Sequence, residues 1–245
     1  MAKKRSTSRP ARTKATVPTL AALATQLSRK KARWRAGETD IAKLDDATRK
    51  RMLGAVPSAE SAALMRAAQA APAILATPPG FAPAVDWRNY RGGNHVSGVK
   101  DQGGCGSCVS FGTTALLESM AHIESSRWID VSEADSHFCS SHGANCGGWW
   151  PDQCLDQAIA RGICDEAAFP YASAFPGSNI FATPPVCRIA GDRAQRIVKP
   201  TSRIALADPT AVKNHITNVG PVTGCLDVFT DFFSYKTGVY HHVSG

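Results

Sequence analysis

The chain has 245 residues, an apolar content of 43% and a formal net charge of +8. This length suits one large domain or a domain with an appendage, and no apolar run approaches the ~18 residues needed to span a bilayer. Lys and Arg are concentrated in residues 1–51, so the basic charge belongs to the N-terminal part and no nucleic-acid partner is expected for the folded domain.

Residues 1–28 predict a flexible basic arm or a targeting segment. They contain no acidic residue and hold a modest apolar stretch, a composition shared with secretory and organelle signals. The sequence does not decide between an arm and a signal, so the compartment stays unknown. The cysteine content, eight in all, favours a secreted protein or another oxidising compartment.

Residues 29–83 predict a proregion-like segment followed by a linker. A charged helix is expected to begin at Asp45 or Asp46 and to stop at Gly54, and an alanine-rich helix is expected after Ser58. Pro and Gly then indicate an extended linker, so the main domain is predicted to span residues 84–245. An inhibitory proregion and a linker without such a role are both compatible with this pattern.

Two helices and two strands are predicted in the main domain. Apolar spacing indicates a helix over residues 108–125 with Ser107 as its N-cap. A second helix is indicated over "WPDQCLDQAIARG" (150–162), with Pro151 near its start and Gly162 past its end. The stretches "GPVTGCLDVF" (220–229) and "TGVYHHV" (237–243) have the composition of strands.

The stretch "DQGGCGSCVSFG" places a cysteine, Cys108, in the first turn of the predicted helix. A helix N-terminus favours a thiolate through its dipole and free N–H groups, which is what a cysteine nucleophile needs. A zinc site made of His137, Cys139, His142 and Cys146 and a thioredoxin-like redox pair made of Cys105 and Cys108 are weaker alternatives, because neither explains the remaining motifs.

Several motifs resemble papain-like cysteine peptidases, in the same order along the chain. They are "VDWRNYRGGNHVSGVKDQG", "QGGCGSCVSF", "HFCSSHGANCGGWWP", "GICDEAAFPY" and "VGPVTGCLDVFTDFFSYKTGVYHHVSG", the last being similar to the cathepsin B branch. The resemblance implies an α+β, two-lobe papain-like fold over residues 84–245, with a complete helical lobe and an incomplete β-rich lobe.

The resemblance also implies a role for individual residues. Cys108 would be the nucleophile, and Gln102 would donate its side-chain amide to the oxyanion together with the backbone N–H of Cys108. Gly147 and Gly148 would bind substrate if the chain has a one-residue deletion relative to the family, since without a gap Trp149 falls where the second glycine is usual. The implied disulfides are Cys105–Cys146 and Cys139–Cys187.

Three further cysteines have no pairing implied by the resemblance, and the chain departs from the family pattern at two places. Cys154 and Cys164 flank one predicted helix and are candidates for an additional bridge, whereas Cys225 is expected in the core of a strand. Val109 stands where the family usually has an aromatic residue. No histidine occurs between Tyr171 and Cys187, so an occluding loop of the cathepsin B type is not expected.

A cysteine peptidase needs a histidine base and usually an Asn that orients it. His241 and His242 lie at a suitable distance along the chain but precede the position that the family pattern gives to the base. The base and the Asn are therefore expected beyond Gly245, and the chain is interpreted as C-terminally truncated and inactive as given.

The sequence thus predicts a cysteine-type endopeptidase that hydrolyses peptide bonds through a thioester at Cys108. The alternative is a non-catalytic, peptide-binding relative. A peptide or protein substrate is the expected partner, no cofactor or metal is expected, and the sequence does not indicate an oligomeric state.

Overall fold

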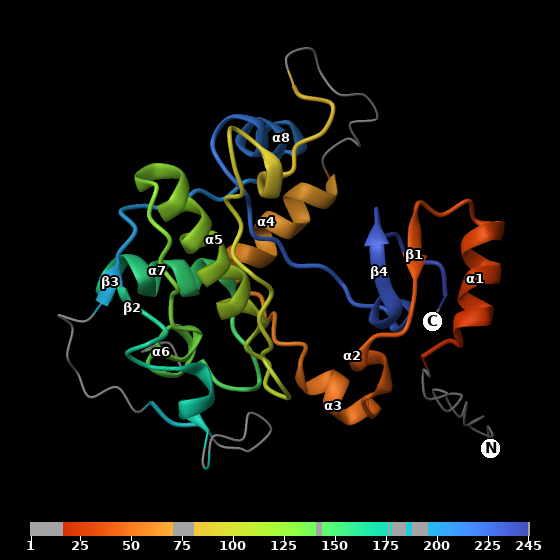
Figure 1. The fold of residues 1–245 in the computed structure, drawn as a ribbon, viewed down its shortest axis with the longest axis horizontal. Helices are drawn as coiled ribbons and strands as arrows, with labels where there is room; N and C mark the ends of the chain where they lie inside the picture. The colour runs from red at the N-terminus through yellow and green to blue at the C-terminus, as the bar shows by residue number, and fades with distance from the viewer. Residues whose placement is uncertain are drawn as a thin grey trace, which may run out of the picture. The chain divides into compact units, whose positions relative to one another are not determined.

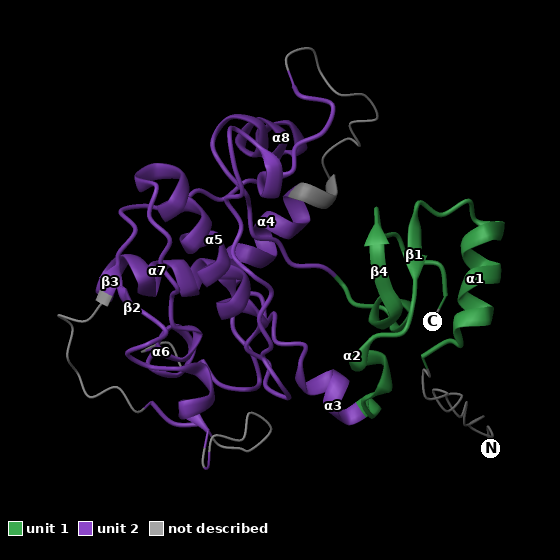
Figure 2. Ribbon diagram, in the orientation of Figure 1, with its two compact units in different colours: residues 1–46, 227–245 green, residues 47–226 purple. Residues whose placement is uncertain are grey.

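The structure, a computed structural model, describes residues 17–70, 81–140, 144–175, 177, 185–187 and 196–244. Two compact units are distinguished in Figure 2, a small one made of residues 1–46 and 227–245 and a large one made of residues 47–226. The described part of the chain has no helix that is long and apolar enough to cross a membrane.

The small unit joins the two ends of the chain through one antiparallel strand pair (Figure 1). Strand β1 (Trp34–Ala36) pairs with β4 (Tyr235–Gly238). The helices of this unit are α1 (Leu20–Arg29), α2 (Asp40–Lys43) and the 3-10 helix η5 (Thr230–Ser234). Its core is built around the buried side chains of Leu23, Trp34 and Val243.

Helix α1 lies within the stretch for which the sequence predicts a flexible arm or targeting segment. Thr19 caps the helix by accepting a hydrogen bond from the backbone N–H of Ala22, and Leu23 is fully buried. Residues 20–28 are therefore ordered because an apolar side chain anchors them, while residues 1–16 lie outside the described range.

The large unit is built around three helices that pack against one another: α5 (Cys108–Ser125), α6 (Glu133–Phe138) and α7 (Pro151–Arg161). The described residues also form α3 (Asp46–Arg51), whose first residue belongs to the small unit, α4 (Ala59–Ala70), η1 (Trp87–Asn89), η2 (Tyr171–Ala174) and α8 (Pro209–Asn218). Strand β2 (Ile163–Cys164) pairs with β3 (Arg196–Val198) in a second antiparallel sheet. The helix predicted over residues 108–125 is confirmed, and the one predicted within residues 150–162 is confirmed as α7.

Helix α5 is positioned by a buried face. Val109, Thr113 and Leu117 are buried and recur every four residues, which places them on one side of the helix. Leu117 packs with Val131 and Ala158 in the core beneath it. This packing fixes the start of α5, where Cys108 lies.

The strand prediction for residues 220–229 is wrong, and the one for residues 237–243 is right only at its first two residues. A strand needs a hydrogen-bonded neighbour, and β4 obtains one from β1. In the described part of the chain, no strand pairs with residues 220–229, which have no regular secondary structure.

Candidate active site

Cys108 is the first residue of α5, and its thiol is free and half-buried. Ser107 occupies the preceding N-cap position, but its hydroxyl makes no capping bond. The Ser107 hydroxyl instead pairs with the Tyr171 hydroxyl at 2.6 Å, and the Tyr171 hydroxyl donates to the Gln102 carbonyl oxygen at 2.9 Å. Tyr171 therefore ties together the two ends of the loop that leads to Cys108.

Two disulfides are present, and they join the pairs that the family resemblance implies. Cys105 is bonded to Cys146 with a Cα–Cα distance of 4.6 Å, and Cys139 is bonded to Cys187 with a Cα–Cα distance of 5.0 Å. The backbone N–H of Gly106 also donates to the Cys146 carbonyl at 3.1 Å. The first bridge thus holds the Cys108 loop against the turn at residues 145–148.

The disulfides exclude the zinc alternative, because Cys139 and Cys146 are both oxidised. His137 is buried and hydrogen-bonds the Ser110 hydroxyl at 2.9 Å and the Asn145 carbonyl at 2.9 Å. Burial lowers the pKa of His137 to about 4, although the Asn145 contact opposes that shift. His142, the fourth residue of that alternative, lies outside the described residues.

The side-chain amide of Gln102 has both of its protons in use. Gln102 Nε2 donates to the Met52 carbonyl at 2.8 Å and to the Cys105 carbonyl at 2.7 Å. An amide NH₂ has two donors, so both are accounted for. One of the acceptors comes from the segment for which the sequence predicts a proregion.

Residues 51–56, here called the overlying segment, run across the site. The Trp149 backbone N–H donates to the Gly54 carbonyl at 2.7 Å, and the Val56 N–H donates to the Trp149 carbonyl at 2.8 Å. Ala55 and Trp149 form a parallel β-bridge. The overlying segment is therefore bound through its backbone, a mode that does not depend on its side chains.

Close backbone approach explains why glycines occupy this contact. A Cβ atom on Gly54 would lie 1.7 Å from the Gly106 carbonyl oxygen, and one on Gly148 would lie 2.3 Å from the Gly54 carbonyl oxygen. Gly148 also has a φ of +118°, which favours glycine. Gly147 contacts Asn145 instead, since its N–H donates to the Asn145 side chain at 2.7 Å.

Sequence reasoning missed two parts of this site. The sequence predicts Gly54 only as a helix terminator, and it gives no signal for the backbone of Trp149 as a binding group. A glycine shortly after a short charged helix is the signal that the sequence offers for Gly54. Its partner, Gly106, is far away along the chain and is seen only in the structure.

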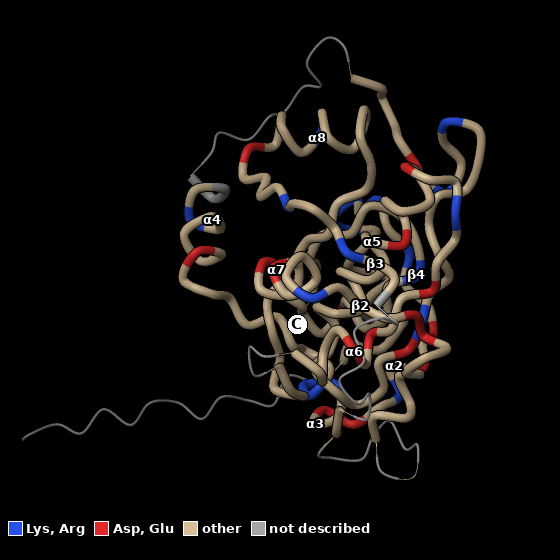
Figure 3. The backbone as a smooth tube through the Cα atoms, turned by 90° about the vertical axis from the view of Figure 1, so that its left-hand side faces the viewer, with Lys and Arg blue, Asp and Glu red and all other residues tan. Residues whose placement is uncertain are grey.

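Helix α4 continues from the overlying segment and is tied to α7. The Ser58 hydroxyl caps α4 by accepting from the Ser61 N–H at 3.1 Å, and it donates to Asp152 at 2.6 Å. Arg203 bridges Glu60 of α4 and Asp156 of α7, at 3.2 Å and 2.6 Å. Figure 3 marks acidic residues on both helices, and one guanidinium offsets their repulsion.

The other three cysteines outside the two disulfides differ from expectation. Cys154 and Cys164 are both buried and neither forms a disulfide, so the additional bridge for which they are candidates is not formed. Cys225 is exposed and lies outside any strand, so its prediction as a core residue is wrong. Desolvation of its thiol, and to a smaller extent the charge of Cys108, raise the pKa of Cys225 to about 11.

His241 and His242 belong to the small unit, whereas Cys108 belongs to the large one. His242 stacks on Phe229 with ring centroids 3.9 Å apart, and its Nδ1 lies 3.2 Å from Asp231.

Comparison with known proteins supports the resemblance. The sequence model of the papain family cysteine proteases matches residues 81–245. Pro-cathepsin H of Mus musculus is 33% identical over 165 residues, which cover 65% of this chain and 46% of that protein. Thiol protease aleurain of Arabidopsis thaliana is 33% identical over 158 residues, covering 63% and 41%. The chain spans about half the length of these relatives.

Solved structures show the fold. Digestive procathepsin L 3 of Tenebrio molitor larval midgut superposes with a TM-score of 0.68 at 22% identity, covering 91% of this chain and 67% of that one. Procathepsin B S9 of Trypanosoma congolense gives 0.63 at 20% identity, covering 94% and 80%. The α+β papain-like fold with an incomplete β-rich lobe is therefore confirmed. The chain belongs to the papain family of cysteine proteases.

Proposed function

We propose that this chain is a cysteine-type endopeptidase in a self-occupied form, with Cys108 as nucleophile and residues 51–56 lying across its peptide-binding site. One hydrogen bond carries the proposal: the side-chain amide of Gln102 donates to the backbone carbonyl of Met52 at 2.8 Å. An amide donor that binds a ground-state carbonyl beside the nucleophile loop is suited to bind the oxyanion that forms from it.

The chemistry follows from these groups. The Cys108 thiolate attacks the carbonyl carbon of a peptide bond, and the carbonyl electron pair moves to oxygen. Gln102 Nε2 and the backbone N–H of Cys108 stabilise that oxyanion, each lowering the barrier by about 3–4 kcal/mol. The carbonyl forms again as the C–N bond breaks, and the amine leaves with the proton that the Cys108 thiol has given up. The thioester to Cys108 remains, and water hydrolyses it to the acid and the free thiol.

Gly147 and Gly148 are proposed to border the bound peptide. Gly148 supports this role because it lies against Gly54 and leaves no room for a side chain. Residues 29–83 are proposed to act as the proregion, and a cut between residues 79 and 84 would separate them from the domain at residues 84–245. Part of that stretch, 79–80, lies outside the described residues.

Acylation and alkylation of Cys108 separate the proposed role of Gln102 from mere packing. Acylation by a p-nitrophenyl ester of an acetylated amino acid passes through an oxyanion, whereas alkylation by iodoacetamide does not. In a Gly54→Val background that disturbs the overlying segment, Gln102→Ala should slow acylation about 100-fold and leave alkylation within about twofold.

Gln153→Ala, on the partly exposed surface of α7, is the matched control and should change neither rate. Release of p-nitrophenolate and the mass added at Cys108 report the two reactions. Equal losses of acylation and alkylation in Gln102→Ala would contradict the assignment.

A non-catalytic peptide-binding role is the second candidate, favoured by the backbone pairing of the overlying segment with Trp149. It predicts that a synthetic peptide of residues 50–57 binds the Gly54→Val chain while the ester never acylates Cys108. Binding with acylation supports the endopeptidase instead.

A further inference from the structure

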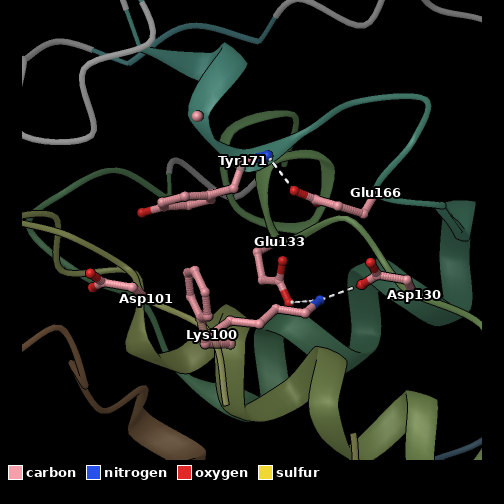
Figure 4. A pocket seen from close by; sticks show the side chains of 8 residues that line it. Lys100, Asp101, Asp130, Glu133, Glu166 and Tyr171 are labelled. Carbon is pink, nitrogen blue, oxygen red and sulfur yellow. Dashed lines mark hydrogen bonds and ion pairs between the residues drawn. The ribbon is translucent and has the colours of Figure 1, made fainter. Parts of the chain in front are cut away.

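A cavity of about 370 Å³ lies beside the start of α5 and α6 in the large unit (Figure 4). Its volume is within the range of small-molecule sites. Four carboxylates and one ammonium face it, from Asp101, Asp130, Glu133, Glu166 and Lys100, and the rings of Phe111 and Tyr171 form its apolar wall. Neither Cys108 nor the overlying segment lines this cavity.

The single ammonium is fully engaged. Lys100 Nζ donates to Glu118 Oε1 at 3.1 Å, to Asp130 Oδ1 at 2.6 Å and to Glu133 Oε1 at 2.8 Å. An ammonium has three protons, so this lysine has no donor left for other acceptors. The cavity lining therefore has four carboxylates and one ammonium, and that ammonium has no proton left for a further carboxylate oxygen.

Two carboxylate oxygens remain without a donor. Glu133 is 2% exposed, and its Oε1 accepts from both Lys100 and Thr114. Glu166 Oε1 accepts from the Tyr171 N–H at 2.7 Å. Glu133 Oε2 and Glu166 Oε2 are both buried and have no hydrogen-bond partner among the described residues.

The two acids face the same space. Figure 4 shows one Glu133 oxygen meeting the Lys100 ammonium while the other points toward the Tyr171 side of the cavity, where Glu166 enters. A buried carboxylate oxygen without a donor is costly, so this geometry favours any molecule that brings N–H donors and positive charge.

The pKa values of Glu133 and Glu166 are both raised, as expected for buried carboxylates with an oxygen that has no donor. Burial raises the pKa of Glu133, against the opposing hydrogen bonds from Lys100 and Thr114. Burial, opposed by the Tyr171 N–H, raises the pKa of Glu166 to about 7. Each carboxylate is thus poised to take up either a proton or a neighbouring cation.

We propose that this cavity binds a small organic cation, a guanidinium or primary ammonium on a short alkyl chain. Its N–H groups would donate to Glu133 Oε2 and Glu166 Oε2, and its alkyl chain would lie against Phe111 and Tyr171. The described residues contain no group of three or more His, Cys, Asp or Glu arranged to hold a metal ion, which favours an organic cation. The site is separate from the proposed peptidase chemistry.

Titration calorimetry of the 245-residue chain with n-butylguanidinium tests the proposal, with neutral n-butylurea as the matched ligand. We expect saturable binding of the cation, no binding of the urea, and at least about tenfold weaker binding in Glu133→Gln and in Glu166→Gln. Glu124→Gln, an exposed acid of α5 outside the cavity, should bind as the unmodified chain does.

Binding should also weaken about tenfold from pH 8 to pH 5.5, since protonated Glu166 cannot accept the cation while the guanidinium stays charged. Circular dichroism checks folding, and Glu166→Gln carries the test if the more buried Glu133→Gln does not fold. No binding, equal binding of n-butylurea, undiminished binding in Glu166→Gln, or preferential binding of Ca²⁺ would each overturn the proposal.

Discussion

Asp231 shows how one carboxylate organises a chain end. It is fully buried and accepts hydrogen bonds from the Tyr240 hydroxyl at 2.7 Å, His242 Nδ1 at 3.2 Å, and the backbone N–H groups of Val243 and Ser244 at 2.7 and 3.0 Å. Burial alone would raise the pKa of Asp231, but these bonds lower it below its ordinary value. A lowered pKa means that the folded state favours the ionised carboxylate.

Asp231→Asn should therefore loosen the end of the small unit by about 2–4 kcal/mol, because two backbone donors lose a charged acceptor. Hydrogen exchange at the Val243 and Ser244 amides measures the loss. The stabilisation is fully present above the pKa of unfolded Asp, about 3.9, and is lost as the pH falls from there through the lower pKa of the folded state. Asp40→Asn, at an exposed residue, is the control; equal exchange in both variants would refute the role of Asp231.

Some helices and strands are predictable from the local sequence, and others are not. α5 and α7 follow from apolar spacing and end signals, such as Pro151 at the start of α7 and Gly162 after its end, where φ is +73°. Ser107 occupies the N-cap position, but the nearby Tyr171 hydroxyl is its partner. Residues 220–229 have strand composition yet lack a paired strand among the described residues, so composition alone misleads there.

Helix α4 provides a prediction at this scale. Ser58→Ala removes the N-cap of α4 and its hydrogen bond to Asp152, at a cost of about 1–2 kcal/mol. Hydrogen exchange across residues 59–67 should accelerate about tenfold while α5 stays protected. Ser125→Ala, at an exposed end of α5, should leave α4 unchanged. Unaltered exchange in α4 of the Ser58→Ala chain would show that other contacts hold this helix.

At the scale of the whole molecule, the sequence predicts the family, the fold class and the start of the helix that begins at Cys108. These features depend on short motifs such as the one around Cys108. The sequence does not reveal that the carbonyl of Met52 lies on Gln102 or that Gly54 lies against Gly106. Both contacts join residues far apart along the chain, and neither leaves a periodic or compositional signal.

The central claim is that Cys108 is the nucleophile and that the overlying segment occupies its peptide-binding site. The most direct measurement is the rate at which an epoxysuccinyl peptide, a thiol-reactive peptide analogue, adds mass to Cys108. A side chain at position 54 cannot fit against Gly106, so Gly54→Val should raise this rate at least about tenfold. Ala55→Val, which adds bulk at the neighbouring exposed residue, should not, and Cys108→Ala should remove the label. Equal labelling with and without the valine at position 54, or label on Cys225 instead, would contradict the account.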